Sequence, residues 1–296
     1  MVQTTVACEE DQCNDTAPNS VEEKYRIDNT ILFRHYLRGQ QRLNEISESI
    51  RYARHIQKAL FPDENHLTGI IEESFLFSIP KEELTGDFTW VTRAGNKVIV
   101  AVADCTGHGI PGAMMSILGL SLLNQVVLEE RCYEPSFILR RLDKKMKDAF
   151  ENKTDSSPLA YDGMDIAVCC IDYSTHILSF AGAMRPAWIC HNDTINELLG
   201  SRYPIGGLQL ENYRNYPAIE TPFERGSMLY LFTDGYTDQF GGPHDKKISR
   251  GRLKKMIQFT NGHSAKEQRE QLLEFFLLWK GDHVQTDDVA FLGIRL

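Results

Sequence analysis

The chain has 296 residues, of which 42% are hydrophobic and 25% are charged, as in a soluble globular protein with one large domain or one domain and an extension. Its formal net charge of -9 argues against a protein that binds nucleic acid by neutralising phosphates. The sequence shows no secretory signal and no apolar run long enough to cross a bilayer, so it predicts a cytoplasmic protein without a membrane segment.

The cysteines are scattered and form no Cys-x-x-Cys pair, so zinc-ribbon and thioredoxin-like functions are unsupported. We expect free thiols in a reducing compartment. The seven positions are Cys8, Cys13, Cys105, Cys132, Cys169, Cys170 and Cys190.

Residues 1–22 are polar and acidic, and their composition predicts a flexible tail. Residues 23–62 are expected to form a regulatory or linker helix region, because apolar residues recur at three- and four-residue steps until Phe61-Pro62. The sequence leaves two interpretations open. The stripe either packs onto the chain's own main domain, or pairs with a second copy as a short coiled coil that Gln57 interrupts. The stripe consists of Leu43, Ile46, Ile50, Ala53, Ile56 and Leu60.

Residues 63–296 are expected to form the main domain, in which strands predominate. Lys97 to Ala103 is a nearly continuous apolar run, as in a strand covered on both faces. Met164 to Ile171 and Ile177 to Ala183 are two further runs, and the short polar segment between them indicates a hairpin. The remaining expected strands are Pro186 to Cys190, Ser227 to Phe232 and Val289 to Arg295.

Three helices are expected among these strands. Pro111 occupies a first-turn position, and residues 113–127 are apolar on almost every side, which indicates a buried helix. Residues 135–150 and 265–278 have the pattern of two more helices. Strands that surround helices predict a layered α+β domain with packed antiparallel sheets.

Four aspartates are expected to close apolar strand-like runs at their ends, each with a glycine or a second carboxylate beside it. A buried carboxylate is costly unless a cation or hydrogen-bond donors compensate it. Four converging aspartates would therefore make an oxygen-rich site for Mg²⁺ or Mn²⁺, although any single Asp-Gly pair is also typical of a turn. The aspartates are Asp87, Asp104, Asp234 and Asp287, and the glycines that leave room for a close backbone approach are Gly86, Gly107, Gly109 and Gly235.

The known motifs for a protein nucleophile are missing. Cys105 has no arginine shortly after it, as a cysteine phosphatase needs, and the sequence has no paired-aspartate phosphoryl-transfer motif. It also has no Gly-x-Ser-x-Gly elbow and no phosphate-binding Gly-x-x-x-x-Gly-Lys-Ser/Thr loop. A set of carboxylates instead favours hydrolysis by metal-activated water in a two-metal site, but spacing alone does not establish one.

Four segments carry the carboxylates in a characteristic order. They are Leu84-Thr85-Gly86-Asp87-Phe88, Asp104-Cys105-Thr106-Gly107-His108-Gly109, Thr233-Asp234-Gly235 and Thr286-Asp287-Asp288. Together they resemble the metal-dependent protein phosphatases of the PPM class, and most of all the bacterial branch typified by SpoIIE and RsbU. The helix over residues 47–62 is similar to the linker before such domains, so the resemblance extends from about residue 45 to the C-terminus. It implies a layered sandwich of two central antiparallel β-sheets flanked by helices, with an N-terminal amphipathic helix.

The resemblance also implies roles for residues. Asp104 would bridge two divalent ions, Mn²⁺ or Mg²⁺, and the backbone carbonyl of Cys105 would take a place usually held by a glycine carbonyl. Asp87 would hold one ion, and Asp234 and Asp287 would complete the set of metal ligands. Asp87, Asp104 and Asp234 are thus the expected catalytic residues, through metal-activated water, and no substrate-binding residue is assigned.

Four polar residues near these segments have no assigned role. His108 and Asp165 could lie near the metals or be ordinary loop and strand-end residues. Arg185 could meet an anionic substrate or be an exposed surface arginine. Asp288 could support the ligands or sit in a solvated turn. Thr89 replaces an aromatic residue common in the family, which is expected to affect packing only.

The implied function is metal-dependent hydrolysis of phosphoserine and phosphothreonine on a protein, with a phosphorylated STAS-domain protein of the anti-sigma-antagonist type as substrate. Bacterial signalling by partner switching, an upstream activator protein and activation through the N-terminal helix, which could form a homodimer, are also implied. Two alternatives remain: a catalytically silent domain that binds a phosphoprotein or scaffolds a complex, and a hydrolase of small phosphate esters. Retention of all four aspartates argues against the silent domain.

Overall fold

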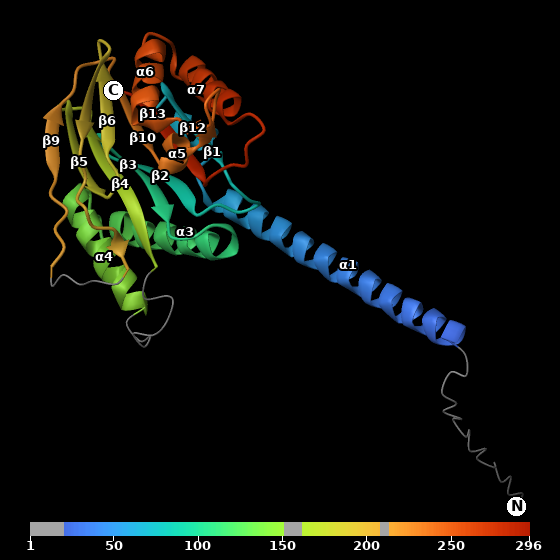
Figure 1. The fold of residues 1–296 in the computed structure, drawn as a ribbon. Coiled ribbons are helices and arrows are strands. Elements are labelled where there is room, and N and C mark those ends of the chain that lie inside the picture. Colours follow the sequence, from blue (N-terminus) through green and yellow to red (C-terminus); the bar gives the residue numbers. More distant parts are fainter. Residues whose placement is uncertain (1–20, 151–161, 208–212) are drawn as a thin grey trace, which may run out of the picture. The chain divides into compact units, whose positions relative to one another are not determined.

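The computed structural model describes residues 21–150, 162–207 and 213–296 (Figure 1). The chain divides into two compact units, residues 1–49 and 50–296, which are described separately. The predicted flexible tail lies outside the described residues as far as residue 20, and residues 21–22 begin the first helix.

The first unit contains most of helix α1 (Val21–Leu60), which begins close to the predicted start. Leu32, Tyr36, Leu43 and Ile46 are exposed and follow one another at steps of four, seven and three residues. Residues at these steps share one face of a helix. An apolar stripe therefore extends along the first unit, without a covering partner among its described residues.

The last turns of α1 belong to the second unit, and there the stripe is not the buried face. Ile56 and Leu60 are 46% and 49% exposed, whereas Gln57 is only 4% exposed. Packing of the stripe onto the main domain is therefore wrong for these two residues. The glutamine that interrupts the heptad is the side chain that the domain buries.

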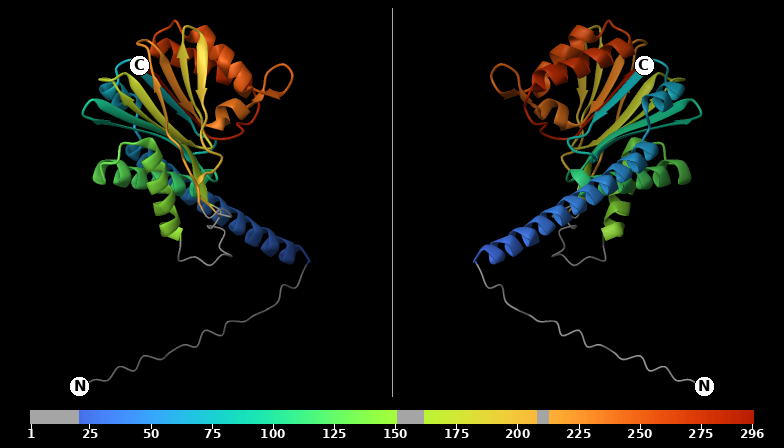
Figure 2. Two further views of the ribbon diagram at one scale, coloured as in Figure 1. Left: turned by 90° about the vertical axis from the view of Figure 1, so that its left-hand side faces the viewer. Right: turned by 90° about the vertical axis from the view of Figure 1, so that its right-hand side faces the viewer.

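Two antiparallel sheets form the centre of the second unit (Figures 1 and 2). Sheet A has five strands, in the order β1 (Ser74–Ile79), β13 (Val289–Arg295), β10 (Met228–Phe232), β6 (Ala187–His191) and β7 (Thr194–Leu198). Sheet B has the order β2 (Asp87–Ala94), β3 (Lys97–Cys105), β4 (Gly163–Asp172), β5 (Ile177–Ala183) and β9 (Ile219–Pro222), and β8 (Ile205–Gly206) pairs with β4.

Helices cover the outer faces of both sheets (Figure 2). Helices α3 (Gly109–Asn124) and α4 (Pro135–Phe150), with the π-helical turn η1 (Gln125–Glu129) between them, pack on sheet B. Helices α6 (Ser249–Thr260) and α7 (Ala265–Lys280) pack on sheet A. The shorter elements are α2 (Glu64–Ile70), α5 (Asp234–Asp238), β11 (Phe240–Gly241) and β12 (Lys246–Lys247).

Successive side chains along β3 of sheet B alternate between two cores, one on each face of the sheet. Ile99, Ala101 and Ala103 of β3 face the helices, whereas Val100 and Val102 face sheet A. Because successive side chains of a strand point to opposite faces, Asp104 belongs to the row that faces sheet A. The end of the space between the sheets is therefore where the carboxylate of β3 must lie.

Most predicted elements are confirmed. The helix over residues 135–150 and the hairpin of β4 and β5 have the expected positions, and β3, β6, β10 and β13 differ from the predictions by at most two residues at either end. Helices α2 and α6 and strand β1 were not predicted. Asp63 caps α2 by accepting a hydrogen bond of 2.7 Å from the His66 N–H, a local signal that the strand-dominated interpretation overlooked.

Two of the carboxylate positions need correction. Asp87 is the first residue of β2 and Asp287 precedes β13, so neither closes a strand as expected. Asp104 lies near the end of β3, and Asp234 follows β10. Because neighbouring strands are antiparallel, a strand start and a strand end meet at the same edge of a sheet.

Helices α3 and η1 form one continuous stretch of 21 residues, Gly109–Glu129, with a mean hydropathy of 1.5. By length and composition this stretch could cross a membrane, which corrects the expectation that no such run exists. Half of its residues are buried, including Leu120 and Leu123, which pack in the core between sheet B and α4. The buried half accounts for its apolar composition without a membrane.

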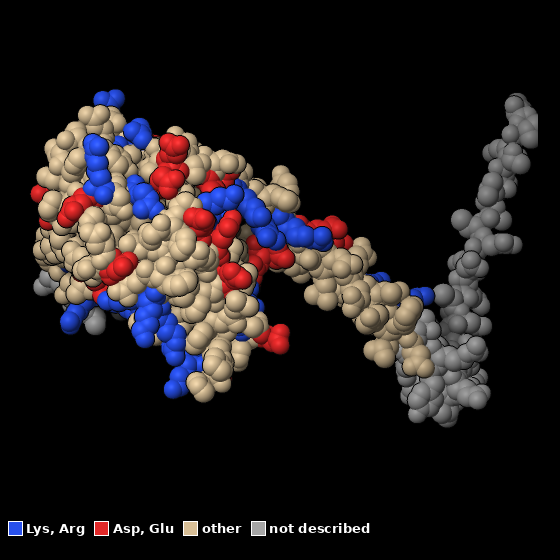
Figure 3. All heavy atoms as spheres, turned by 90° about the horizontal axis from the view of Figure 1, so that it is seen from above, with Lys and Arg blue, Asp and Glu red and all other residues tan. Residues whose placement is uncertain are grey.

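Charged side chains of both signs are interspersed on the face drawn in Figure 3. No continuous basic tract is visible there among the described residues. This distribution agrees with the acidic overall composition.

Candidate active site

Three aspartates form a row across neighbouring strands of sheet B. Asp87 of β2 is opposite Asp104 of β3, and Asp104 is opposite Asp165 of β4. Directly opposed residues point to the same face of a sheet and have neighbouring side chains, and like charges at such positions are destabilising. We call these three residues the aspartate row. The register thus brings together two predicted ligands and Asp165, which the sequence had left without a role.

Sheet A contributes carboxylates from the other side of the gap between the sheets. Asp234 begins α5 directly after β10, and Asp287 and Asp288 directly precede β13, the neighbour of β10. The charges of Asp234 and Asp287 both raise the pKa of Asp104. The four predicted ligands therefore converge at one end of the sandwich, with Asp287 the most exposed to solvent.

Arg185 lies in the middle of these carboxylates. It follows β5, and its Nη2 is 2.5 Å from Asp104 Oδ2, 3.0 Å from Asp234 Oδ2 and 3.4 Å from Asp165 Oδ2. The residue is 8% exposed, so it is not the surface arginine that the sequence left open as one interpretation. A single nitrogen thus faces three acidic side chains.

Burial and mutual repulsion make these carboxyl groups hard to ionise. Burial raises the pKa of Asp104 to about 7, against the attraction of Arg185 and with further repulsion from Asp234. Burial likewise raises the pKa of Asp165 to about 6. Burial and the neighbouring Asp104 raise the pKa of Asp87 well above its usual range.

Backbone groups around the row are packed closely. A Cβ on Gly86 would lie 2.8 Å from the carbonyl oxygen of Gly107 and 3.2 Å from that of Cys105. A Cβ on Gly112 would lie 2.3 Å from the Gly107 oxygen. Glycine at these positions thus lets the Cys105 carbonyl, the predicted backbone ligand, lie beside the start of β2.

The thiol of Cys105 points the other way, into the core between sheet B and its helices. Burial raises its pKa well above the usual range, so the thiolate that a cysteine nucleophile needs is disfavoured. The side chain therefore has a packing role.

Asp288 holds the segment that leads into β2. Its Oδ1 accepts a hydrogen bond of 2.7 Å from the Lys81 N–H, and its Oδ2 accepts one of 2.8 Å from the Gly86 N–H. Both oxygens are thus engaged with the backbone, and the residue is 3% exposed. Asp288 is therefore a support for the residue before Asp87, not a solvated turn residue.

Gln57 of α1 holds the same segment from the helix side. Its Nε2 donates to the Thr85 carbonyl at 2.7 Å and its Oε1 accepts from the Thr85 N–H at 3.2 Å. Its Nε2 also lies 3.2 Å from Ser116 Oγ of α3. The sequence pattern identified Gln57 only as an interruption of an apolar stripe; a polar residue in such a stripe is the signal that could have pointed to this role.

His108 lies outside the aspartate row. It occupies the position before α3, and its Nδ1 is 2.6 Å from Glu82 Oε1, with both side chains half exposed. His108 therefore contacts Glu82 at the edge of the site and does not join the aspartate row.

The donor set suits a hard divalent cation. In the described part of the chain, no three His, Cys, Asp or Glu side chains are close enough to hold a metal ion as they stand, and the Arg185 guanidinium lies among the carboxylates. Asp87 Oδ2 is buried without a hydrogen-bond partner, which is costly for a carboxylate oxygen. Carboxylate and backbone carbonyl oxygens are the ligands that Mg²⁺ and Mn²⁺ prefer. The residues therefore fit the implied ions in type.

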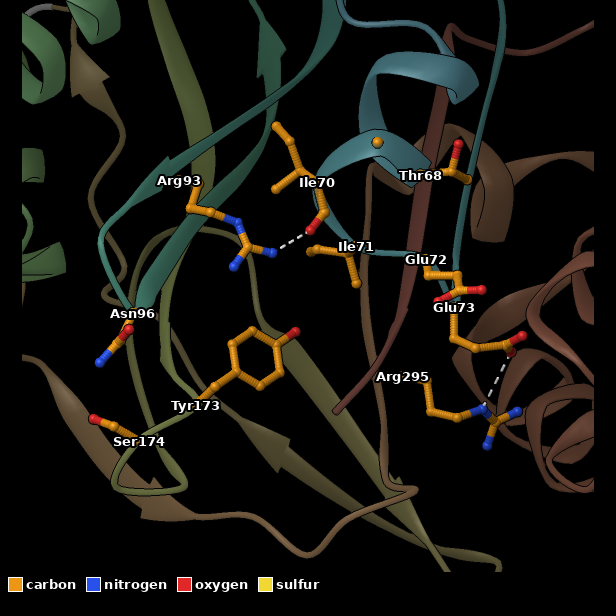
Figure 4. Close-up of a pocket in the computed structure, with 11 residues that line it drawn as sticks. Thr68, Ile70, Ile71, Glu72, Glu73, Arg93, Asn96, Tyr173, Ser174 and Arg295 are labelled. Atoms are coloured by element: carbon orange, nitrogen blue, oxygen red, sulfur yellow. Dashed lines mark hydrogen bonds and ion pairs between the residues drawn. The ribbon is translucent and has the colours of Figure 1, made fainter.

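Two cavities lie at opposite ends of the sandwich. One of about 610 Å³ is beside the aspartate row and is lined in part by Asp165, Asp234, Lys247 and Arg250. The other, of about 890 Å³, is lined by residues of the β2–β3 and β4–β5 turns, of the segment before β1 and of the end of β13 (Figure 4).

The larger cavity is distant from the aspartate row. Asp104 is seven positions after Lys97, the first residue of β3, so these two residues are roughly 23 Å apart along the strand. Its two arginines are engaged: Arg93 donates to the Ile70 carbonyl, and Arg295 Nε is 3.6 Å from Glu73 Oε2 (Figure 4). The carboxylates gather at the other end, so the chemistry belongs to the smaller cavity.

Comparisons with known proteins agree with this geometry. The chain is similar to the phosphoserine phosphatase RsbU of Bacillus subtilis (strain 168), with 25% identity over 266 residues, which are 88% of this chain and 72% of RsbU. Among solved structures, the SiaA-PP2C domain of Pseudomonas aeruginosa matches with a TM-score of 0.78 and 28% identity, covering 86% of this chain and 98% of that domain.

A third match is the PP2C phosphatase domain of SpoIIE from Bacillus subtilis with a fragment of its regulatory domain. Its TM-score is 0.60 at 17% identity, over 75% of this chain and 61% of that one, and it supports the fold alone. The family model described as stage II sporulation protein E (SpoIIE) matches residues 94–296, more than half of the chain. The resemblance to the SpoIIE/RsbU branch of the PPM class and the layered α+β fold are thereby confirmed, and the chain belongs to the SpoIIE family.

Proposed function

We propose that this protein is a metal-dependent phosphatase that hydrolyses phosphoserine and phosphothreonine on a protein substrate. The observation that carries the proposal is the aspartate row, in register across β2, β3 and β4, facing Asp234 of the opposite sheet. Such a concentration of like charge at a buried sheet edge is unfavourable unless cations compensate it. Divalent ions, when bound, lower the pKa of a water molecule and neutralise charge on the attacked phosphate.

The protein's own residues bind and orient. Asp104, at the centre of the row, has a carboxylate on each side, and we propose that it would contact both ions, with Asp87, Asp234 and Asp287 as the other carboxylate ligands. The Cys105 carbonyl adds a neutral oxygen. We propose two ions, Mn²⁺ or Mg²⁺, in this arrangement.

The cavity beside the row suits an anionic side chain. Lys247 and Arg250 are on its wall, where they pair with Asp238 at 2.7 Å and Glu197 at 3.1 Å. A phosphate group could replace these carboxylates as the partner of Lys247 and Arg250, which would favour the approach of a phosphorylated segment to the row. A phosphoserine or phosphothreonine side chain of a protein surface would enter from this side.

The similarity to RsbU supports a finer proposal about the pathway. We propose a phosphorylated STAS-domain protein of the anti-sigma-antagonist type as substrate, within bacterial partner switching, and an upstream activator protein. A homodimer formed through the apolar stripe of α1 is part of the same proposal. The cytoplasmic location stays a prediction.

The first test compares Mn²⁺-dependent hydrolysis of phosphoserine and phosphothreonine peptides by the wild type, Asp104→Asn and Asp172→Asn. Asp172 is the matched control, because it ends the strand that contains Asp165, at the end away from the row, and contacts its own turn and Lys97 at 4.0 Å. We expect turnover that a chelator abolishes, a loss of about 100-fold or more in Asp104→Asn and little change in Asp172→Asn.

The alternatives are distinguishable outcomes of the same assay. Turnover that Asp104→Asn retains would contradict the carboxylate site. Metal binding without turnover of any phosphate ester would favour the silent phosphoprotein-binding domain. Faster turnover of p-nitrophenyl phosphate than of a phosphorylated STAS-domain protein or the peptides would favour a hydrolase of small esters.

A further inference from the structure

The contacts of Arg185 differ from those of an ordinary ion pair. One nitrogen, Nη2, lies 2.5, 3.0 and 3.4 Å from carboxylate oxygens of Asp104, Asp234 and Asp165. Its Nε is buried without a hydrogen-bond partner. A guanidinium normally binds carboxylates with two parallel N–H donors, so this arrangement uses Arg185 as a point of positive charge.

One nitrogen cannot satisfy these partners. Nη2 carries two protons, whereas three carboxylates face it. A divalent ion has no such directional limit and binds carboxylate oxygens at about 2.0–2.2 Å. An ion bound by the same Oδ2 atoms of Asp104 and Asp234 would compete for them with Nη2, which is 2.5 and 3.0 Å away. The guanidinium and a metal ion therefore compete for the same acceptor oxygens.

The backbone of Arg185 is held in place, which leaves its side chain as the part that can move. A Cβ on Gly182 or Gly200 would lie 2.1 or 2.6 Å from the Arg185 carbonyl oxygen, so both glycines pack against it. The Met184 N–H donates to the Ser201 carbonyl at 2.8 Å, which ties the loop to its neighbour.

We propose that Arg185 is a positioning residue that holds the ligand carboxylates in the metal-free protein and sets the metal affinity by being displaced when the ions bind. The inference rests on the proposed metal site but not on turnover. In the metal-free protein the guanidinium compensates part of the charge of the aspartate row, which would otherwise be buried without a cation. Metal binding must then break the contact between Arg185 and Asp104. The free energy of metal binding is less favourable by the free energy of that contact.

The test is a titration of the full chain with Mn²⁺ by calorimetry at one pH, comparing the wild type with Arg185→Gln and Arg141→Gln. Arg141 of α4 is the matched control. It is a surface arginine whose Nε lies 2.9 Å from Glu130 Oε2. We expect Arg185→Gln to bind Mn²⁺ about tenfold or more tightly than the wild type and to melt at a lower temperature without metal. Arg141→Gln should keep the wild-type affinity.

Equal or weaker binding by Arg185→Gln would overturn the proposal, as would the absence of binding by all three proteins. Binding by Arg185→Gln alone would support it even if the wild type shows no phosphatase activity, so the two failures are distinguishable.

A second measurement needs no variant and covers the case in which Arg185→Gln does not fold. Arginine side-chain ¹⁵N resonances of the wild type are recorded during a titration with diamagnetic Mg²⁺. Displacement predicts that the Arg185 guanidinium changes from hindered to free rotation as Mg²⁺ binds. Unchanged hindrance at saturating Mg²⁺ would contradict it.

Discussion

At the scale of single residues, Asp104 has the most demanding environment. It lies between two other aspartates in register, and Asp234 faces it from the opposite sheet. Arg185 offsets only part of this repulsion, so burial and the like charges together still raise the pKa of Asp104 to about 7. In the metal-free protein both protonation states of the central carboxyl group are therefore populated near neutral pH.

This proton makes metal binding depend on pH. Ligand carboxylates must be deprotonated, so an ion has to displace the proton of Asp104, with a pKa of about 7. The charge of the ion also favours loss of the proton of the neighbouring Asp165, with a pKa of about 6. We expect the affinity for Mn²⁺ to rise as the pH rises from about 5.5 to 7.5, with proton release. Calorimetry in buffers of different ionisation enthalpy measures both quantities, and a pH-independent affinity would contradict the prediction.

The same shift affects stability in the absence of metal. A carboxyl group whose pKa is raised in the folded state stabilises the fold fully below its ordinary pKa of 3.8. This contribution is lost as the pH rises through about 7. In Asp104→Asn the side chain at position 104 is neutral at every pH, so the variant lacks this loss of stability. The melting temperature of the variant minus that of the wild type should therefore increase from pH 4 to pH 7. Thermal unfolding in a chelator at several pH values is the measurement, and a constant difference would argue against the raised pKa.

Residue by residue, the sequence predicted which aspartates converge better than it predicted their surroundings. Asp87, Asp104 and Asp234 lie in motifs whose order is readable along the chain. Asp165 and Arg185 lie in no such motif; they reach the site through strand register and through the β5–β6 loop, which only the folded sheets specify. Spacing along a chain contains no information on which strands become neighbours.

At the scale of elements, the end of α1 and the segment before β2 act together. Gln57 makes two hydrogen bonds to Thr85, and Asp288 makes one to Gly86, so both backbone groups next to Asp87 are held from outside the strand. A change at the end of the helix is therefore transmitted to a ligand over two residues.

Replacing Gln57 tests this connection. Gln57→Leu keeps the size of the side chain but leaves the buried N–H of Thr85 unsatisfied and removes one of the two donors to its carbonyl, the other being Ser116 Oγ, which costs about 1–3 kcal/mol. We expect denaturant unfolding to show that loss and calorimetry to show weaker Mn²⁺ binding. Gln41→Leu is the matched control on the same helix, since Gln41 is exposed and bonds only Glu45; it should change stability by less than about 0.5 kcal/mol.

The loop between β3 and α3 depends on a close backbone contact. In Gly112→Ala the new Cβ would be 2.3 Å from the Gly107 carbonyl oxygen, so the loop after Asp104 must shift. We expect a loss of about 1–3 kcal/mol in unfolding free energy, with reduced phosphatase activity. Gly69→Ala, in α2 with no atom within 4 Å of its Cβ, should be neutral or slightly stabilising in the same unfolding assay.

Elements with a strong period were predictable, whereas α6 and β1 were not predicted. The helix over residues 135–150 has one apolar face, and the β4–β5 hairpin joins two apolar runs through a polar turn. Helix α6 buries few of its twelve residues, among them Leu253 and Ile257, which gives it a weak periodic signal. Strand β1 is no shorter than the predicted strands β6 and β10, but its pairing with β13 is a contact between distant parts of the chain.

At the scale of the whole molecule, the chain combines a catalytic unit with a helical one. The helical unit exposes Leu32, Tyr36, Leu43 and Ile46 on one face. Exposed apolar side chains in a continuous row mark a surface that pairs with another apolar surface. The position of this row ahead of the catalytic unit agrees with the proposed homodimer.

Charged residues introduced into the apolar stripe of α1 should dissociate the proposed homodimer. We expect the wild type to have twice the chain mass in light scattering coupled to size exclusion, and the double variant Leu32→Glu/Leu43→Glu to have the mass of one chain, because buried like charges oppose pairing. Arg34→Glu/Arg38→Glu changes charge off the stripe and should leave the dimer in place. A monomeric wild type at micromolar concentration would contradict the dimer while leaving the catalytic proposal intact.

The position of β13 has a consequence for synthesis of the protein. This strand lies between β1 and β10, so neither of those strands has its full set of backbone partners until residues 289–295 are available. A nascent chain that has emerged only as far as α7 therefore exposes unpaired strand edges and an open apolar layer, which are surfaces prone to aggregation. Ribosome-bound chains stalled before residue 289 should be sensitive to protease and should recruit chaperones, and this sensitivity should end once the last strand is released.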